Sequence, residues 1–145
     1  MEEGKRFFQK IFGVQHVFFQ CLHAMGVEHV HPRQGPILGF LLHGGEGSQA
    51  DIVRKMKVSA ATVAVSISRL EKLGFVTRER NQENQRANVL RLTEKGRAVA
   101  VQMEAIMKEM SEVALEGFTS EEQEAMERYC DRMCKNLQQH YKAKE

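Results

Sequence analysis

Apolar residues recur at helical spacing along most of this chain, and the pattern changes to strand-like alternation in a short stretch after residue 74. Between residues 59 and 74, Val63, Ile67 and Leu70 lie three or four positions apart, which predicts one buried face of an amphipathic helix. Ser59 is placed to cap its first turn, and Gly74 suits the left-handed conformation in which many helices end. The pattern therefore predicts a helix that starts after Ser59 and stops before Gly74.

A shorter helix is predicted just before it, between residues 51 and 58. Ile52, Val53 and Met56 have the spacing to face inward along this segment. Ser48 and Asp51 match a capping box, in which each side chain accepts a hydrogen bond from the other residue's backbone amide. Two short helices joined by a tight turn predict a helix-turn-helix.

The residues that follow Gly74 are typical of a β-hairpin. The runs FVTRER (75–80) and ANVLRL (87–92) contain alternating apolar and β-branched residues, and they flank the polar segment NQENQR (81–86). We expect two strands with a polar tip, after which Thr93 and Glu94 begin the next helix. Such a hairpin beside a helix-turn-helix predicts a wing, and Arg86 at its tip could enter a DNA minor groove.

Short and polar side chains occupy the face of the 59–74 helix that is opposite its apolar residues. Such groups can approach base edges or phosphates when a helix lies in the major groove. The small alanines also suggest that methyl contacts and DNA shape carry part of the specificity. The residues predicted to face the major groove are Ser59, Ala60, Ala61, Thr62, Ser66 and Arg69, and those predicted to lie near phosphates are Lys57, Arg78 and Arg80.

Residues 59–96 resemble the MarR family of winged helix-turn-helix transcriptional regulators. The family pattern consists of a recognition helix, RLEKxG, a wing and LTxxG, and this chain has RLEKLG at 69–74 and LTEKG at 92–96. The resemblance covers nearly the whole chain, because HPRQGPILGFLLHGGEGSQADIVRKM (31–56) is similar to the second and third helices of the family. It implies a mainly α fold with a small β-hairpin wing, and a regulator of prokaryotic type.

The wing departs from the family pattern at one position. The family usually carries Asp-x-Arg there, and this chain has Asn84, Gln85 and Arg86. The arginine is retained, but a neutral asparagine offers it a weaker hydrogen bond than a carboxylate would. We therefore expect Arg86 to be held less firmly than its counterparts in the family.

Positive charge is concentrated in the predicted DNA-binding segment. Residues 54–97 contain eleven Lys and Arg against four Asp and Glu, which makes this segment +7, and the net charge of +2 leaves −5 for the remainder. A basic segment of this kind favours nucleic acid as a partner, although an ordinary solvated surface is the alternative.

The terminal segments are predicted to form helices with apolar faces. Many apolar residues line the first helix, and Thr119 with Glu122 would cap a last helix in which apolar residues are spaced four, three and four apart. The resemblance implies one MarR-like domain over 1–145, with a winged helix-turn-helix lobe at about 32–96 and a helical dimerisation region at about 5–30 and 97–143. Two recognition helices about one DNA turn apart would then bind a pseudo-palindromic operator. The alternative is a monomer whose terminal helices cover the core. The apolar residues are Phe7, Phe8, Ile11, Phe12, Phe18, Phe19, Leu22 and Met25 in the first helix, and Met126, Cys130, Met133 and Leu137 in the last.

The sequence leaves three possibilities for what the protein senses. The first, which the family resemblance favours, is a small aromatic or amphipathic ligand. Its pocket would be lined by Phe19, His23, His31, Met103 and Met107. A metal is the second possibility, because imidazoles and a thiol crowd the end of the first helix and the following loop, but their spacing matches no compact zinc motif. We therefore expect neither a metal site nor a cofactor. The candidate ligands are His16, Cys21, His23, His29 and His31.

A reactive thiol is the third possibility. Reactivity would require a lowered thiol pKa and an accessible site, whereas the neighbours Phe18, Phe19 and Leu22 predict that Cys21 is buried. Cys130 and Cys134 lie one helical turn apart, where they could bind a soft metal or pack as small apolar residues.

Other classes of protein lack their sequence signatures here. The chain has no Gly-x-Ser-x-Gly, no phosphate-binding Gly-x-x-x-x-Gly-Lys and no His-Glu-x-x-His, so we expect no enzyme, and the Gly-rich FLLHGGEGS (40–48) predicts a turn between helices. No segment approaches the roughly 18 apolar residues of a membrane span. With three cysteines in no framework spacing, a reduced cytoplasmic protein is expected.

We predict a repressor that binds double-stranded operator DNA as a homodimer. The alternative is a winged-helix adaptor that binds another protein.

Overall fold

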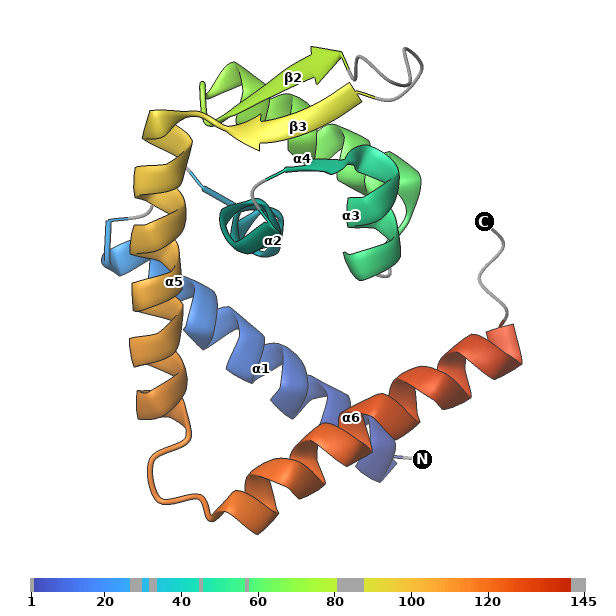
Figure 1. The fold of residues 1–145 in the computed structure, drawn as a ribbon. Coiled ribbons are helices and arrows are strands. Elements are labelled where there is room, and N and C mark those ends of the chain that lie inside the picture. The colour runs from blue at the N-terminus through green and yellow to red at the C-terminus, as the bar shows by residue number, and fades with distance from the viewer. Residues whose placement is uncertain are drawn as a thin grey trace. The chain divides into compact units, whose positions relative to one another are not determined.

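Helices make up most of the described chain, together with one small sheet, which confirms the predicted fold class. The computed structural model describes residues 2–26, 30–31, 34–44, 46–56, 58–80 and 88–141. They form two compact units, Met1–Met110 and Ser111–Glu145. The elements in chain order are α1 (Glu2–Ala24), α2 (Gly35–Gly44), β1 (Gly47–Ser48), α3 (Gln49–Met56), α4 (Ala60–Lys72), β2 (Val76–Arg80), β3 (Asn88–Leu92), α5 (Glu94–Ala114) and α6 (Ser120–Tyr141) (Figure 1).

The ends of α4 are formed as its sequence predicts. The Ser59 hydroxyl accepts a hydrogen bond from the Thr62 amide at 3.2 Å, so one of the free amides of the first turn is satisfied. At the other end Gly74 has a φ of +78°, and the amide that follows it, on Phe75, donates to the Leu70 carbonyl at 2.9 Å. This is a Schellman turn, and it directs the chain from α4 into β2.

The capping box of α3 is also confirmed. The Ser48 amide donates to the Asp51 carboxylate at 3.0 Å, and the Asp51 amide donates to the Ser48 hydroxyl at 3.1 Å. The reciprocal pair satisfies two backbone donors at the start of a helix of eight residues. It thereby stabilises the helix that precedes α4 in the helix-turn-helix.

The capping box predicts a specific sensitivity to acid. Hydrogen bonds from the Ser48 amide and hydroxyl, and from the Arg54 guanidinium, hold the pKa of the Asp51 carboxyl below its usual 3.8. A lowered carboxyl pKa stabilises the folded state above the unfolded-state pKa, and this contribution is lost as the pH falls through the folded-state value. Asp51→Asn cannot titrate. We expect the difference in unfolding free energy between wild type and Asp51→Asn to be constant near neutral pH and to shrink below about pH 3.8 in urea titrations; a constant difference throughout would contradict this account.

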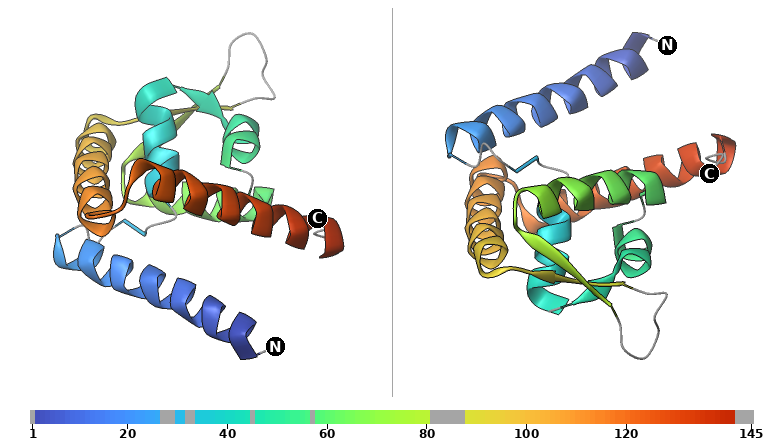
Figure 2. Two further views of the ribbon diagram at one scale, coloured as in Figure 1. Left: turned by 90° about the horizontal axis from the view of Figure 1, so that it is seen from below. Right: turned by 90° about the horizontal axis from the view of Figure 1, so that it is seen from above.

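The sheet contains the predicted hairpin and one strand that the sequence did not predict. β2 and β3 pair antiparallel, with Arg78 opposite Leu90, and the views in Figure 2 show them side by side. In addition Gly47 and Ser48 pair with β3, giving the order β1-β3-β2. The prediction of a simple turn at 40–48 was therefore incomplete. A strand of two residues is too short to carry an alternating pattern, so only the partner strand defines it.

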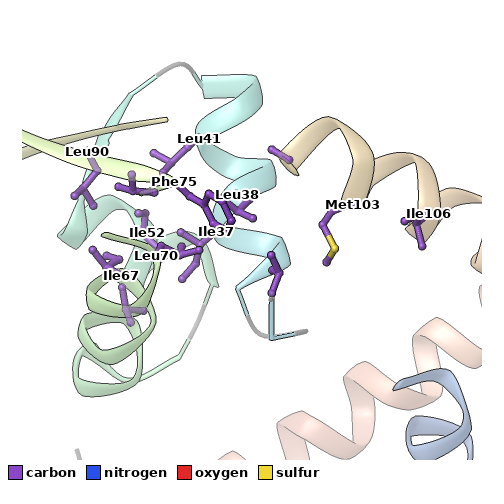
Figure 3. Packing of buried hydrophobic residues seen from close by; sticks show 14 of the residues in the cluster. Ile37, Leu38, Leu41, Ile52, Ile67, Leu70, Phe75, Leu90, Met103 and Ile106 are labelled. Atoms are coloured by element: carbon purple, nitrogen blue, oxygen red, sulfur yellow. The ribbon is translucent and has the colours of Figure 1, made fainter. Parts of the chain in front are cut away.

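The core lies between α2, α3, α4 and the sheet, and all three predicted core residues of α4 belong to it. Figure 3 shows the labelled side chains of these elements pointing toward one another. α5 adds Met103 and Ile106, which are 3% and 8% exposed. The largest fully buried side chains are those of Leu38, Leu41, Ile52, Val63, Ile67, Leu70 and Leu90.

Within the described residues, no helix has the length and apolar content needed to cross a membrane.

Thr93 joins the end of α4, the start of β2 and the first turn of α5. Its hydroxyl donates to the Gly74 carbonyl at 2.6 Å and accepts from the Gly96 amide at 2.9 Å. Its own amide donates to the Phe75 carbonyl at 3.0 Å. One residue therefore caps α5 and holds it against the turn that follows α4.

Candidate nucleic-acid interface

Most, but not all, of the residues predicted to face the major groove are exposed at the start and along the surface of α4. Ser59, Ala60, Ala61 and Arg69 are exposed, and Thr62 is half-buried. Ser66 is 8% exposed, so it does not lie on the open face as predicted. The reason is helical geometry: Ser66 follows Val63 by three residues and precedes Leu70 by four, which places it in the buried stripe.

Three exposed residues of α4 were missed by the sequence prediction. Val65, Ser68 and Lys72 lie four, seven and eleven positions after Ala61, and all three are exposed. The signal was present in the sequence, because a helical period counted from Ala61 points away from the core residues at these positions. The open face of α4 is therefore formed by Ala61, Val65, Ser68, Arg69 and Lys72.

The hydroxyl groups at the start of α4 are held together. The Ser59 and Thr62 side-chain oxygens lie 2.8 Å apart, within hydrogen-bond distance. Because the Ser59 hydroxyl also accepts from the Thr62 amide, its orientation is determined by the helix cap. The helix thus presents a rigid first turn, and the positive end of its dipole favours anionic groups such as phosphates.

Ion pairs connect the wing to the rest of the lobe. Arg78 Nε donates to Glu71 Oε1 at 2.7 Å, which joins β2 to the last turn of α4. Arg91 on β3 pairs with Glu46 at 2.5 Å and with Glu79 at 3.5 Å. Arg78, which was predicted to lie near a phosphate, thus has an internal carboxylate partner. The Arg78–Glu71 pair supports the orientation of the hairpin relative to α4, and the Arg91 pairs join β3 to β2 and to the residue before β1.

The other basic residues predicted to contact DNA are Arg80, Lys57 and Arg86, and only the first lies within the described residues. Arg80 is exposed at the end of β2. Lys57 and Arg86 lie outside the described residues, as do Asn84 and Gln85 of the predicted wing tip. The role of Arg86 in the minor groove therefore stays a prediction.

A cleft lies between α1 and α4, and Ala61, Val65 and Arg69 of the open face are among the residues that line it. Its volume is 610 Å³. Phe19 and His31 line it, as predicted for a ligand site, whereas His23, Met103 and Met107 are not among its described lining residues. Met103 instead is buried in the core, where its terminal methyl would lie 3.1 Å from a side chain at Gly35. The lining residues are Gln15, Phe19, His31, Gln34, Ala61, Thr62, Val65, Ser66 and Arg69.

The cysteines are accessible, and the metal ligands considered above do not gather into a group of three within the described residues. Cys21, Cys130 and Cys134 are free thiols, and all three are exposed in the single chain. The predicted burial of Cys21 is wrong, because Cys21 points about 100° away from its buried neighbour Leu22 on the helix. His29 lies outside the described residues, and in the part of the chain that the structure describes no three His, Cys, Asp or Glu are placed to hold a metal ion.

Large apolar side chains remain exposed on the terminal helices. On α1, Phe12 and Val14 are 61% and 70% exposed, and on α6 Leu137 is 50% exposed. α6 begins at the predicted capping box, in which the Thr119 amide donates to Glu122 at 2.8 Å, and none of its residues is buried in the single chain. Apolar surface of this extent is typical of a protein interface.

The order α2, α3, α4, β2 and β3 is that of a winged helix-turn-helix, a class of DNA-binding domain. Residues 30–87 match the model of the MarR family. Over 95 residues, which are 66% of this chain and 68% of the relative, the sequence is 30% identical to the uncharacterised HTH-type transcriptional regulator YwhA of Bacillus subtilis strain 168. The chain belongs to the MarR family.

A second relative from the same organism, the uncharacterised HTH-type transcriptional regulator YybA, is 34% identical over 90 residues. The match spans 62% of this chain and 60% of YybA, less than two thirds of that protein.

Solved structures show the same fold. A putative MarR family transcriptional regulator from Listeria monocytogenes, in complex with a 26mer DNA, has a TM-score of 0.74 at 21% identity, with 92% of this chain and 90% of that chain covered. The PcaV transcriptional regulator from Streptomyces coelicolor, in complex with its natural ligand, has a TM-score of 0.77 at 20% identity, with 88% of each chain covered. The likeness extends well beyond residues 30–87 that match the family model.

Proposed function

We propose that this chain is a transcriptional repressor that binds a pseudo-palindromic double-stranded operator as a homodimer and responds to a small amphipathic ligand. The observation that carries the proposal is the open face of α4, which lies next to a β-hairpin in the segment of net charge +7. A helix with small side chains on its outer face can lie deep in the major groove, where base edges are accessible.

Electrostatics supports DNA as the partner. Arg69, Lys72 and Arg80 are exposed on α4 and β2, where they can neutralise phosphates. Each phosphate that a protein neutralises releases condensed counterions, so the affinity of such a protein falls as the salt concentration rises. The Listeria relative in complex with DNA has the same fold, which makes this mode of binding geometrically reasonable.

A homodimer is proposed because the terminal helices leave apolar surface exposed in the single chain. Met126, Cys130, Met133 and Leu137 repeat on α6 at a spacing close to a coiled-coil seam, and none of them is buried in the protomer. Contact with a second copy would remove this surface from water. Two copies would also place two recognition helices on successive turns of one DNA duplex. A dimer bound in this way would exclude other proteins from the operator, which is how it would repress transcription.

The ligand is proposed to bind in the cleft between α1 and α4. Its 610 Å³ volume lies within the range of small-molecule sites, and Phe19 supplies an aromatic wall beside the polar Gln34 and Arg69. Because Ala61, Val65 and Arg69 belong both to the cleft and to the open face of α4, a bound ligand would alter the position of α4. A ligand that prefers one arrangement of α4 then changes the affinity for DNA.

Fluorescence anisotropy with fluorescent duplexes tests this function directly. We expect selective binding to a subset of AT-rich palindromes over random duplex, by a species of twice the chain mass, with affinity that decreases steeply with salt. Binding that is equal for all duplexes, or a monomeric species at saturation, would contradict the proposal.

Arg86→Ala provides a prediction for the wing. If the guanidinium enters the minor groove, its loss should weaken operator binding by about 1–3 kcal/mol. Lys108→Ala, which removes the same charge from the exposed surface of α5, is the matched control and should bind like wild type. Equal affinity of Arg86→Ala and Lys108→Ala in a gel shift would refute the role of Arg86.

A further inference from the structure

Val65 is an exposed apolar residue at the centre of the open face of α4. Its side chain is 54% exposed, whereas the core residues Val63, Ile67 and Leu70 on the opposite face are at most 1% exposed. A single exposed valine is ordinary on a protein surface. The neighbours of Val65 on this face distinguish it: Ala61 lies one turn before it and Ser68 nearly one turn after.

The first part of α4 lacks every side chain that normally distinguishes bases by paired hydrogen bonds. Such pairs are made by Arg or Lys to guanine and by Asn or Gln to adenine, and Asp or Glu can accept a single hydrogen bond from the amino group of cytosine. The segment 60–68, AATVAVSIS, contains none of these six residue types. Its hydroxyl groups can either donate or accept, so they discriminate weakly between bases. On the part of the open face that lies within residues 60–68, the chemical feature that remains is the methyl group.

Only thymine presents an apolar group in the major groove among the four standard base pairs, through its 5-methyl carbon. We infer that Val65, with Ala61 beside it, contacts thymine methyl groups and is the main determinant of base specificity in α4. This inference rests on the proposed binding of operator DNA. Arg69 and Lys72 follow at the C-terminal end of the same face, where their charges can hold the helix on phosphates.

Val65 also lines the cleft between α1 and α4, so a contact with a small ligand is the competing role. The two roles differ in what they require of DNA. A thymine contact makes the affinity depend on one methyl group of the base, whereas a contact with a ligand does not. Deoxyuridine lacks only this methyl group and keeps the base pair, so it separates the two roles.

The test begins with an operator selected from random duplexes by the full chain, and then replaces its thymines one at a time by deoxyuridine. We expect at least one position in each half-site at which wild type loses about fourfold in affinity, which corresponds to the roughly 0.8 kcal/mol of one buried carbon. Val65→Ala should bind the thymine operator several-fold more weakly and should no longer respond to deoxyuridine at that position. Val65→Thr retains one methyl and keeps the shape, so it should respond to an intermediate extent.

Val101→Ala is the matched control, because Val101 on α5 is also 54% exposed, and it should bind and respond like wild type. Circular dichroism and thermal unfolding of each variant verify that its helix content and stability match those of wild type. Selective binding that is insensitive to deoxyuridine, or equal sensitivity in wild type and Val65→Ala, overturns the inference and leaves the proposed function intact. If no selected duplex is bound in preference to random DNA, the proposed function fails, and the inference fails with it.

Discussion

Leu137→Glu is expected to convert the proposed dimer into a monomer and to lower operator affinity about 100-fold or more. Leu137 is 50% exposed in the single chain, so the substitution removes no contact from the core of the protomer. In the proposed dimer, however, it would place a carboxylate within the apolar seam of α6, and burial of an unpaired charge is strongly unfavourable. The second half-site is then no longer bound by a linked recognition helix, and linkage of two sites is worth about 10² to 10⁴ in affinity.

Light scattering after size exclusion measures the mass, and anisotropy on the same sample measures the affinity. Gln139→Glu is the matched control, because it adds the same charge about 160° away from Leu137 around α6, on its polar side. We expect Gln139→Glu to remain dimeric and to bind DNA normally. A dimeric Leu137→Glu would show that α6 does not form the seam, and a monomer with full affinity would show that dimerisation is not needed for DNA binding.

Gly96→Ala is expected to destabilise the fold by about 3 kcal/mol, near the upper end of the usual cost of overpacking. A Cβ at Gly96 would lie 1.9 Å from the Phe75 carbonyl oxygen and 2.7 Å from its carbon. These atoms belong to the backbone that accepts the hydrogen bond of Thr93, so they cannot move without loosening the start of α5 from the turn after α4. This contact is the physical reason for glycine in the LTEKG motif.

Alanine at Gly39 should instead increase the stability of the fold. Gly39 is inside α2, and among the described residues nothing lies within 4 Å of a Cβ placed there. Alanine in a helix interior is favoured over glycine by roughly 0.5–1 kcal/mol, so Gly39→Ala should raise the unfolding free energy. Urea unfolding followed by circular dichroism compares both variants with wild type. Wild-type stability of Gly96→Ala would contradict the close approach of Phe75 and α5.

Residues with strong local signals were predicted correctly. Val63, Ile67 and Leu70 are the buried face of α4, and the caps of α3, α4 and α6 form the predicted hydrogen bonds. Capping boxes and apolar periodicity depend on residues three or four positions apart, so the chain encodes them locally. The hairpin was predictable for the same reason, because its strands alternate in composition and are joined by a short polar segment.

Gly47, Ser48 and Ser66 were predicted less well, for two different reasons. Gly47 and Ser48 form a strand only because Leu90 and Val89 lie opposite them. Ser66 was assigned to the open face because of its polarity, although its position in the helix places it among buried residues. Polarity alone is a weak guide to exposure when a small hydroxyl occupies the border of a core.

The sequence by itself determined the helix-turn-helix, the wing strands and the family to which they belong, because these follow from local periodicity, capping residues and short motifs. Only the tertiary structure decided that Arg78 pairs with Glu71, and that Phe19 and His31 meet Arg69 in one cleft. It also showed that Gly96 touches the backbone of Phe75. Each of these facts depends on residues from different elements of the fold, and packing of these elements is what brings them into contact.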